Sequence, residues 1–354
     1  MGNIGVAEVA SKNGTNPLRV LFFCGERSRW GYSHLVPLLS EPRLELVAVV
    51  MATEERWTIF RSALSGEIYK PFGWKGKAKS VVKTLMGQKT LNRTRSSLST
   101  LSKHNVPVLF CDDVNSPASA DSFKEYNADL ILCAAYPQIF NPELLSVSPK
   151  GAFNSHPSLL PRCRGAHPVF WAIASGEKES GATIHHMTRD LDQGDIVVQI
   201  AVSLLPMETY SELYAKLANL IPALISKFTT FVVTPGSCPT PQDDTKATYY
   251  RNDRRIHHRI FWSKMSATQI RNLVRACEGN AYCWFRDNKI MVHQIKVADT
   301  NRNMTNGISV PPGTIVDICD KIPVVATRSE FVSLESLALP KLRKVNFEIG
   351  QILH

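Results

Sequence analysis

A carboxamide, an imidazole and a carboxylate stand in two short segments near the middle of the sequence. Asn154 and His156 lie two residues apart in the run FNSHPSLLP (153–161), and Asp192 follows in the run TRDLDQGD (188–195). At the end of a strand, Asn154 and His156 would point to the same side, because alternate residues of a strand share a face. Asn can donate a hydrogen bond to an oxygen that gains negative charge, His can move a proton near neutral pH, and Asp can hold the His tautomer. Such a set could transfer an acyl group without a covalent enzyme intermediate.

The order and spacing of these residues resemble those of the folate-dependent formyltransferases. The resemblance rests on the runs NSHPSLLP (154–161), RG (164–165), GATIH (181–185) and LDQGD (191–195). It implies that the Asn-His-Asp triad of the family falls on Asn154, His156 and Asp192, and not on Asp190 or Asp195. It also implies that the formyl donor is 10-formyltetrahydrofolate.

Donor-binding positions follow from the same resemblance. In the family, the loop after the strand expected at 128–134 contacts the pterin ring, which implies donor-binding roles for Tyr136, Gln138 and Ile139. Tyr136 could instead be an aromatic residue at a strand end. Gly194 would permit a tight loop beside the donor.

Five further charged or titratable residues lie near the triad in sequence. Arg162 and Arg164 flank the loop after His156, where they could bind an anionic substrate or the folate tail, or could be solvated loop charges. The other histidines nearby lack the sequence pattern NSHPSLLP that surrounds His156; they are His167, His185 and His186. We expect these three histidines to have pocket or structural roles.

The first two thirds of the chain predict an α/β fold. Apolar runs at 19–24, 44–51, 106–111 and 128–134 predict short buried strands, with a helix around 33–39 between the first two. Near-continuous hydrophobicity is typical of a parallel sheet that is covered on both faces. No G-x-G-x-x-G follows Gly25, so we do not expect a dinucleotide site. The expected fold is the mostly parallel, Rossmann-like sheet of the formyltransferases.

The composition divides the chain into four expected parts. These are an N-terminal extension (1–18), a catalytic domain (19–235) with a basic insertion (52–105), a linker (236–246) and a C-terminal domain (247–354). One helix-like segment at 210–233 would close the catalytic domain, and the linker is rich in proline, glycine and polar residues. Short strands and an amphipathic helix at 266–277 resemble the C-terminal formyltransferase domain, which implies a small OB-like β-barrel.

Positive charge is concentrated in the insertion. The formal net charge is +10, and residues 70–95 hold eight basic residues and no acidic one. Methionyl-tRNA formyltransferases carry a basic insertion here that enters the acceptor end of the tRNA. The resemblance therefore implies initiator tRNA as a partner, with Lys75, Lys77 and Lys79 on phosphates and Trp74 as a stacking aromatic. The same segment could instead form a lid helix.

The acceptor amine has more than one candidate. Methionyl-tRNA is the preferred interpretation, but the run GAHPVFW (165–171) is closer to formyltransferases that act on sugars or peptidyl amines. An amino sugar nucleotide or another small amine is therefore the second candidate. A formyltetrahydrofolate hydrolase and a folate- or RNA-binding module without chemistry are alternatives from other classes.

Composition predicts a soluble globular protein. The 354 residues are 44% hydrophobic and 20% charged, and no apolar run is long enough to span a bilayer. Eight scattered cysteines without a C-x-x-C pair predict reduced thiols and no metal site. Residues 1–17 lack the features of a transit or secretory peptide. We expect a cytoplasmic enzyme with no membrane partner, and the oligomeric state stays open.

Overall fold

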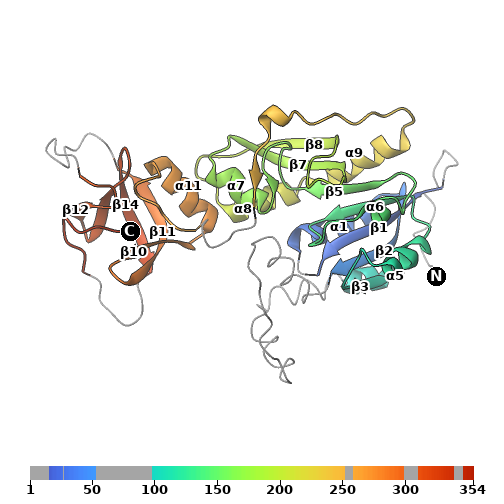
Figure 1. Cartoon of the computed structure of the whole chain (residues 1–354), viewed down its shortest axis with the longest axis horizontal. Coiled ribbons are helices and arrows are strands. Elements are labelled where there is room, and N and C mark those ends of the chain that lie inside the picture. Colours follow the sequence, from blue (N-terminus) through green and yellow to red (C-terminus); the bar gives the residue numbers. More distant parts are fainter. Residues whose placement is uncertain (1–15, 27, 53–97, 252–257, 299–309, 339–345) are drawn as a thin grey trace, which may run out of the picture. The chain divides into compact units, whose positions relative to one another are not determined.

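The computed structural model describes residues 16–26, 28–52, 98–251, 258–298, 310–338 and 346–354 (Figure 1). They form two compact units. The first contains the described residues up to 52, residues 98–153 and residues 225–237; the second contains residues 154–224 and the described residues from 238 onward. The basic segment 70–95, with Lys75, Lys77 and Lys79, lies outside the described residues.

Four parallel strands form the sheet of the first unit. Their order is β3-β2-β1-β4, with bounds β1 (Leu18–Gly25), β2 (Leu44–Ala52), β3 (Val108–Cys111) and β4 (Leu130–Ala134). The helices of this unit include α1 (Arg29–Ser40), α5 (Pro117–Lys124) and α6 (Pro142–Leu145). Every side chain from Val20 to Cys24 in β1 is fully buried. The strand-helix-strand opening and the parallel pairing are therefore confirmed.

The sheet continues with β5. In the sequence, the boundary between the two units falls within this strand. β5 (Ala152–His156) is followed in the sheet by β7 (Glu179–His186) and β8 (Ile196–Ser203), and β7 and β8 are antiparallel. Between β5 and β7 lie β6 (Arg164–Gly165) and α7 (Pro168–Ala174). The seven-stranded order β3-β2-β1-β4-β5-β7-β8 is the mostly parallel α/β sheet that the sequence predicts.

Residues 210–233 are helical, as the sequence predicts, and they form two helices. The first is α8 (Tyr210–Ala218) and the second is α9 (Ile221–Val233). Pro222 explains the break, because proline has no backbone N–H and its ring clashes with the carbonyl of the residue four positions earlier in a helix. That residue is Ala218, where α8 ends.

The C-terminal part is built on an antiparallel sheet. Its strand order is β10-β11-β14-β13-β12, with bounds β10 (Ala281–Phe285), β11 (Asn288–Val297), β12 (Ile315–Cys319), β13 (Ile322–Ala326) and β14 (Phe331–Ala338). The helix α11 (Ala267–Cys277) contacts β11 and α7. Ser266 and Gln269 close a capping box at its start, which explains why it begins there. The predicted amphipathic helix and second domain of short strands are confirmed.

The segment expected as a linker is bonded to the rest of the second unit. Ile196 and Thr240 exchange both backbone hydrogen bonds, each of 2.8 Å. The short helix η1 (Asp244–Lys246) follows, and β9 (Tyr249–Tyr250) pairs in parallel with β6. Residues from 238 onward belong to the second compact unit. The predicted domain bounds stay a prediction.

No single helix in the described ranges is long and apolar enough to cross a membrane, although α8 and α9 reach that length and hydropathy as a bent pair. Leu217, Ile221, Leu224 and Phe228 of this pair are fully buried within the protein. All eight cysteines are free of disulfide bonds.

Candidate active site

Asn154 and His156 extend from the end of β5 toward the same carboxylate. Asn154 Nδ2 lies 3.3 Å from Asp192 Oδ1, and His156 Nδ1 lies 3.6 Å from Asp192 Oδ2. The intervening Ser155 is also buried. The alternation of strand side chains therefore places the amide and the ring together, as the i, i+2 spacing predicts.

Asp192 occupies the turn between β7 and β8. Its carboxylate accepts a 2.8 Å hydrogen bond from the backbone N–H of Gly165, and its residue is 5% exposed. Burial alone would raise the pKa of Asp192. The neighbouring His156, together with His185 and the Gly165 N–H, outweighs burial and lowers that pKa from 3.8 to about 2. Asp192 is therefore an anion at neutral pH.

Both ring nitrogens of His156 face a partner. Nε2 donates a 2.9 Å hydrogen bond to the carbonyl of Cys163, and a carbonyl can only accept, so this nitrogen carries a proton. Nδ1 faces the Asp192 carboxylate. A second proton on Nδ1 would give an imidazolium held between two acceptors. To act on a substrate oxygen, the ring must exchange one of these partners for it.

His185, for which a pocket or structural role is expected, belongs to this cluster. Its Nδ1 donates to the carbonyl of His186 at 2.7 Å, so in the neutral ring Nε2 accepts from Asn154 Nδ2 at 3.2 Å. The same Nε2 lies 3.5 Å from Asp192 Oδ1. Strand alternation in GATIH could have indicated that His185 points inward, but not that it meets Asn154.

Gly194 has a steric reason to be glycine. A Cβ on it would lie 2.0 Å from the carbonyl oxygen of His186, which is backbone and cannot move aside cheaply. The turn also closes through a 2.9 Å bond from the His186 N–H to the Asp195 carbonyl. The tight loop expected at Gly194 is present, and its contact with the donor stays a prediction.

Arg162 and Arg164 are both engaged within the protein. Arg164 is 6% exposed, and its guanidinium donates to Gln242 Oε1 at 2.8 and 3.1 Å and to Asp244 Oδ1 at 2.7 Å. Arg162 is ion-paired with Glu177. Arg164 therefore ties two segments of the chain together in this structure, and a substrate contact for either arginine stays a prediction.

The predicted donor-binding loop lies in the first unit, and its residues differ in burial. Tyr136 packs against Phe23 at 5.5 Å between ring centroids, and its buried hydroxyl has no hydrogen-bond partner within the described residues. Burial raises the pKa of this hydroxyl, so it stays protonated. Ile139 is 44% exposed. A contact of Tyr136 or Ile139 with the folate donor stays a prediction.

The side chain of Gln138, in the same loop, forms hydrogen bonds with the protein backbone. Its Oε1 accepts from the Val114 N–H at 3.2 Å, and its Nε2 donates to the Asp112 carbonyl at 2.7 Å. The side chain therefore holds the loop before α6 against the loop before α5. A direct contact between the Gln138 side chain and the donor stays a prediction.

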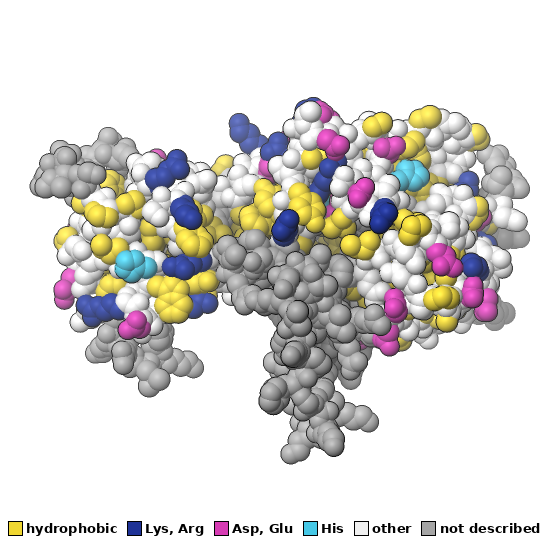
Figure 2. Space-filling view, in the orientation of Figure 1, with side chains coloured by type: hydrophobic (Ala, Val, Ile, Leu, Met, Phe, Trp, Pro, Cys, Tyr) yellow, Lys and Arg dark blue, Asp and Glu magenta, His cyan; other side chains and the backbone are white. Residues whose placement is uncertain are grey.

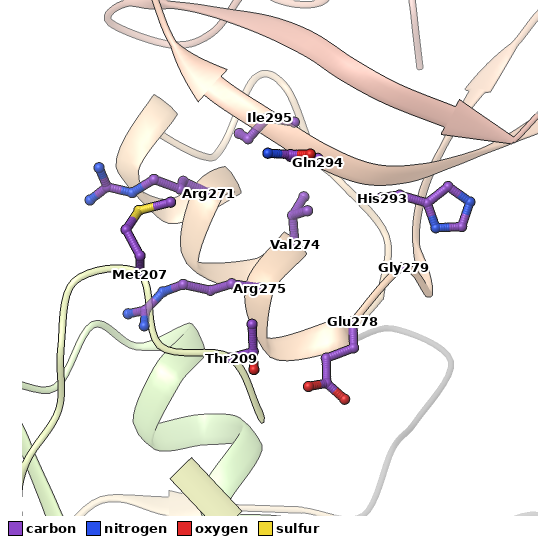
Figure 3. Close-up of a pocket in the computed structure, with 10 residues that line it drawn as sticks. All are labelled: Met207, Thr209, Arg271, Val274, Arg275, Glu278, Gly279, His293, Gln294 and Ile295. Atoms are coloured by element: carbon purple, nitrogen blue, oxygen red, sulfur yellow. The ribbon is translucent and has the colours of Figure 1, made fainter. Parts of the chain in front are cut away.

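One pocket in the second unit lies apart from the triad. It has a volume of about 500 Å³ and is lined by α11, β11 and the turn before α8 (Figure 3). Arg275 spans this region by donating to the carbonyls of Glu208 and Leu205, at 2.7 and 3.2 Å. Burial, and then the neighbouring Arg271, lower the pKa of Arg275. The contacts of Arg275 hold the turn against α11.

No cluster of His, Cys, Asp and Glu in the described ranges is placed to hold a metal ion.

Comparison with known proteins identifies two matching family models. Residues 77–229 match the formyl transferase model, and residues 255–348 match the formyl transferase C-terminal domain. A methionyl-tRNA formyltransferase of Staphylococcus aureus is 31% identical over 240 residues, which are 67% of this chain and 75% of the relative.

Solved structures share the fold at lower identity. An N-formyltransferase from Helicobacter canadensis, in complex with folinic acid and dTDP-3-aminofucose, is 15% identical with a TM-score of 0.56 and covers 90% of this chain and 98% of its own. A sugar N-formyltransferase from a Shewanella species is 18% identical with a TM-score of 0.53, covering 78% of this chain and 97% of its own. At these identities the likeness concerns the fold.

Proposed function

Because this chain belongs to the formyl transferase family, we propose that its acceptor is the amino group of methionyl-tRNA. The chain is a folate-dependent formyltransferase, and its formyl donor is 10-formyltetrahydrofolate. The acceptor rests on one observation above the others, the 31% identity to a methionyl-tRNA formyltransferase across three quarters of that relative.

The donor supplies a formyl carbon that an amine attacks, and the site must then stabilise negative charge and take up a proton. Asn154 offers its Nδ2 protons to the formyl oxygen, in exchange for the bonds to Asp192 and His185. His156 offers a ring N–H to the same oxygen. Because His156 is buried, low dielectric around its ring strengthens this interaction.

Asp192 is the group that favours proton removal. It is anionic because its pKa is lowered to about 2, and it lies between the Asn154 amide and the His156 ring. An anion there stabilises an imidazolium at His156, so that His156 or Asp192, directly or through a water, takes the proton of the attacking amine and passes it to the tetrahydrofolate nitrogen as the bond of that nitrogen to the formyl carbon breaks. Asn154, His156 and Asp192 are thus the proposed catalytic residues.

The C-terminal part of the chain carries basic side chains next to aromatic rings, which supports a nucleic-acid acceptor. Lys289 Nζ lies 3.8 Å from the centre of the Tyr282 ring, and Arg259 and Lys264 lie over Phe261 at 5.0 and 5.7 Å. Figure 2 shows basic side chains beside hydrophobic ones on the described surface of this part. Cationic and aromatic groups together bind phosphates and stack on bases.

The direct test measures tetrahydrofolate release with three acceptors. Methionyl-tRNA, a panel of amino sugar nucleotides, and buffer without an amine are each mixed with the protein and 10-formyltetrahydrofolate. We expect fast release with methionyl-tRNA only, accompanied by formylmethionyl-tRNA. Release that needs no amine would identify a hydrolase, and turnover of a sugar nucleotide without a tRNA product would assign the chain to sugar formylation.

A further inference from the structure

Residues 238–250, here called the strap, are bonded to the turn that carries Asp192 and to the segment that follows β5. Besides the Thr240–Ile196 pair, the strap binds the loop after β5 through Thr248. The Arg164 N–H donates to the Thr248 carbonyl and the Cys163 N–H to Thr248 Oγ1, both at 2.8 Å. The strap therefore runs across the loop that supplies the Cys163 carbonyl to His156.

Gln242 is the strap residue that reaches the turn of Asp192. Its Nε2 donates to the carbonyls of Asp192 and Gly194, at 2.9 and 2.7 Å. Its Oε1 accepts two bonds from the Arg164 guanidinium, at 3.1 and 2.8 Å. Both amide protons and both acceptor positions are thus used, so the orientation of this side chain is fully determined.

The Asp192 turn is a conformation that needs such support. Asp192 has φ of 57°, in the left-handed region that side-chain-bearing residues rarely adopt. The direction of its carboxylate follows from that backbone, because a peptide rotation at Asp192 would swing Oδ2 away from the Gly165 N–H. Residues in this region persist where surrounding contacts hold them.

Gln242 also connects the two sides of the site. Arg164, which it accepts from, directly precedes Gly165, the residue that donates to Asp192. The Gln242 amide therefore contacts both the backbone of the turn that carries Asp192 and the side chain of Arg164. Asp244 shares Arg164 from the same strap.

We propose that Gln242 is a positioning residue for formyl transfer, which fixes the Asp192 turn relative to the segment after β5 that holds Arg164 and Gly165. The proposal rests on the triad function given above. It assigns the strap a part in catalysis beyond joining two domains.

Two substitutions separate positioning from general folding. Gln242→Leu removes all four bonds, whereas Gln242→Glu keeps the acceptor for Arg164 and loses the donor to the Asp192 and Gly194 carbonyls. Asp243→Asn is the matched control, because Asp243 is on the same strap and its side chain pairs with Thr245 and Lys246. Thermal unfolding and tetrahydrofolate binding stoichiometry establish the folded fraction of each variant.

We expect both Gln242 variants to lower kcat by roughly tenfold to a hundredfold at equal folded fraction, since small misplacements of reacting groups have effects of this size. The KM values for donor and acceptor should change much less, because Gln242 contacts the turn and not the substrates. Asp243→Asn should keep wild-type kcat. A Gln242→Glu enzyme with wild-type kcat would overturn the proposal.

Amide hydrogen exchange supplies a second readout that needs no turnover. The Gly165 N–H is protected by Asp192 Oδ2, so peptides covering 163–166 and 192–196 should exchange faster in both Gln242 variants and unchanged in Asp243→Asn. Unchanged exchange in the Gln242 variants would also overturn the proposal. Faster exchange in a protein whose wild type transfers no formyl group would support the positioning and refute the proposed function instead.

Discussion

Asp192 is the residue on which the other polar groups of the site converge. The Gly165 N–H, the His156 ring and the Asn154 amide all face its carboxylate, and 95% of its surface is withdrawn from solvent. Its charge therefore holds the amide and the ring in the places from which they can meet a substrate. Removal of that charge should disturb both neighbours at once.

The first prediction concerns the loss of individual donors. Asn154→Ala and His156→Ala should each leave the protein folded and slow formyl transfer by roughly a hundredfold or more, because each removes a hydrogen-bond donor to the formyl oxygen. Initial rates at saturating donor check this, with circular dichroism as the control for folding. Near-full activity in both variants would remove the triad assignment.

The second prediction concerns acid stability. A carboxyl whose pKa is lowered on folding stabilises the native state above its unfolded pKa, here 3.8, and loses that contribution as the pH falls through about 2. The contribution is on the order of 2 kcal/mol. The difference in unfolding free energy between wild type and Asp192→Asn should therefore be constant from pH 7 to about 5 and move toward zero or reverse in sign below about pH 4.

Urea titrations at a series of pH values measure this difference. The sign is diagnostic, since wild type should lose stability relative to Asp192→Asn on acidification. A difference that stays constant down to about pH 3 would show that the Asp192 pKa is not lowered by its neighbours.

At the scale of elements, the β7–β8 hairpin sets the position of the carboxylate. The turn is tight enough that Gly194 has no room for a methyl group. Gly194→Ala should therefore destabilise the protein by about 1–3 kcal/mol and lower activity, because backbone must shift to admit the Cβ. Gln193→Ala, at the exposed neighbouring position, should stay within about 0.5 kcal/mol of wild type. Equal effects of the two substitutions would contradict the steric explanation.

The elements that the sequence predicts well are those with strong local signals. β1 and β2 are continuous apolar runs, and α11 has an apolar stripe and a capping box. Asn154 and His156 meet Asp192 because strand alternation fixes their direction. The break before Pro222 is not among the predictions, although proline disfavours a helix interior.

The elements that escaped prediction depend on contacts between segments that are distant in sequence. The bonds of Gln242 to Asp192 and Arg164 span 50 and 78 residues. His185 meets Asn154 across neighbouring strands, 31 residues apart. Composition suggested a linker at 236–246 because proline, glycine and polar residues disfavour helices and strands. Composition does not indicate the side-chain hydrogen bonds that hold this segment.

For the whole molecule, the net charge of +10 bears on the choice of acceptor. If the insertion binds tRNA, Lys75, Lys77 and Lys79 release condensed counterions from the phosphates, so affinity falls steeply with salt. Between about 50 and 200 mM salt, tRNA affinity should fall by roughly an order of magnitude or more. Neutralising the three lysines together should flatten this dependence, while transfer to a small amine stays largely unchanged.

The matched control for this prediction is neutralisation of three lysines elsewhere in the chain, Lys124, Lys150 and Lys227, which leaves the same net charge. The salt dependence of that protein should resemble that of wild type more closely. If both triple variants flatten the slope equally, the effect belongs to net charge, and a specific role for the insertion is ruled out.

The most direct test of the central claim follows the formyl group itself. Donor carrying a labelled formyl carbon is mixed with excess enzyme and methionyl-tRNA for a single turnover, with wild type and with Asp192→Asn. The account predicts label on the methionyl amino group with wild type, and transfer slower by roughly a hundredfold or more with Asp192→Asn. Label released as formate, label absent from the methionyl-tRNA, or equal rates for the two proteins would contradict it.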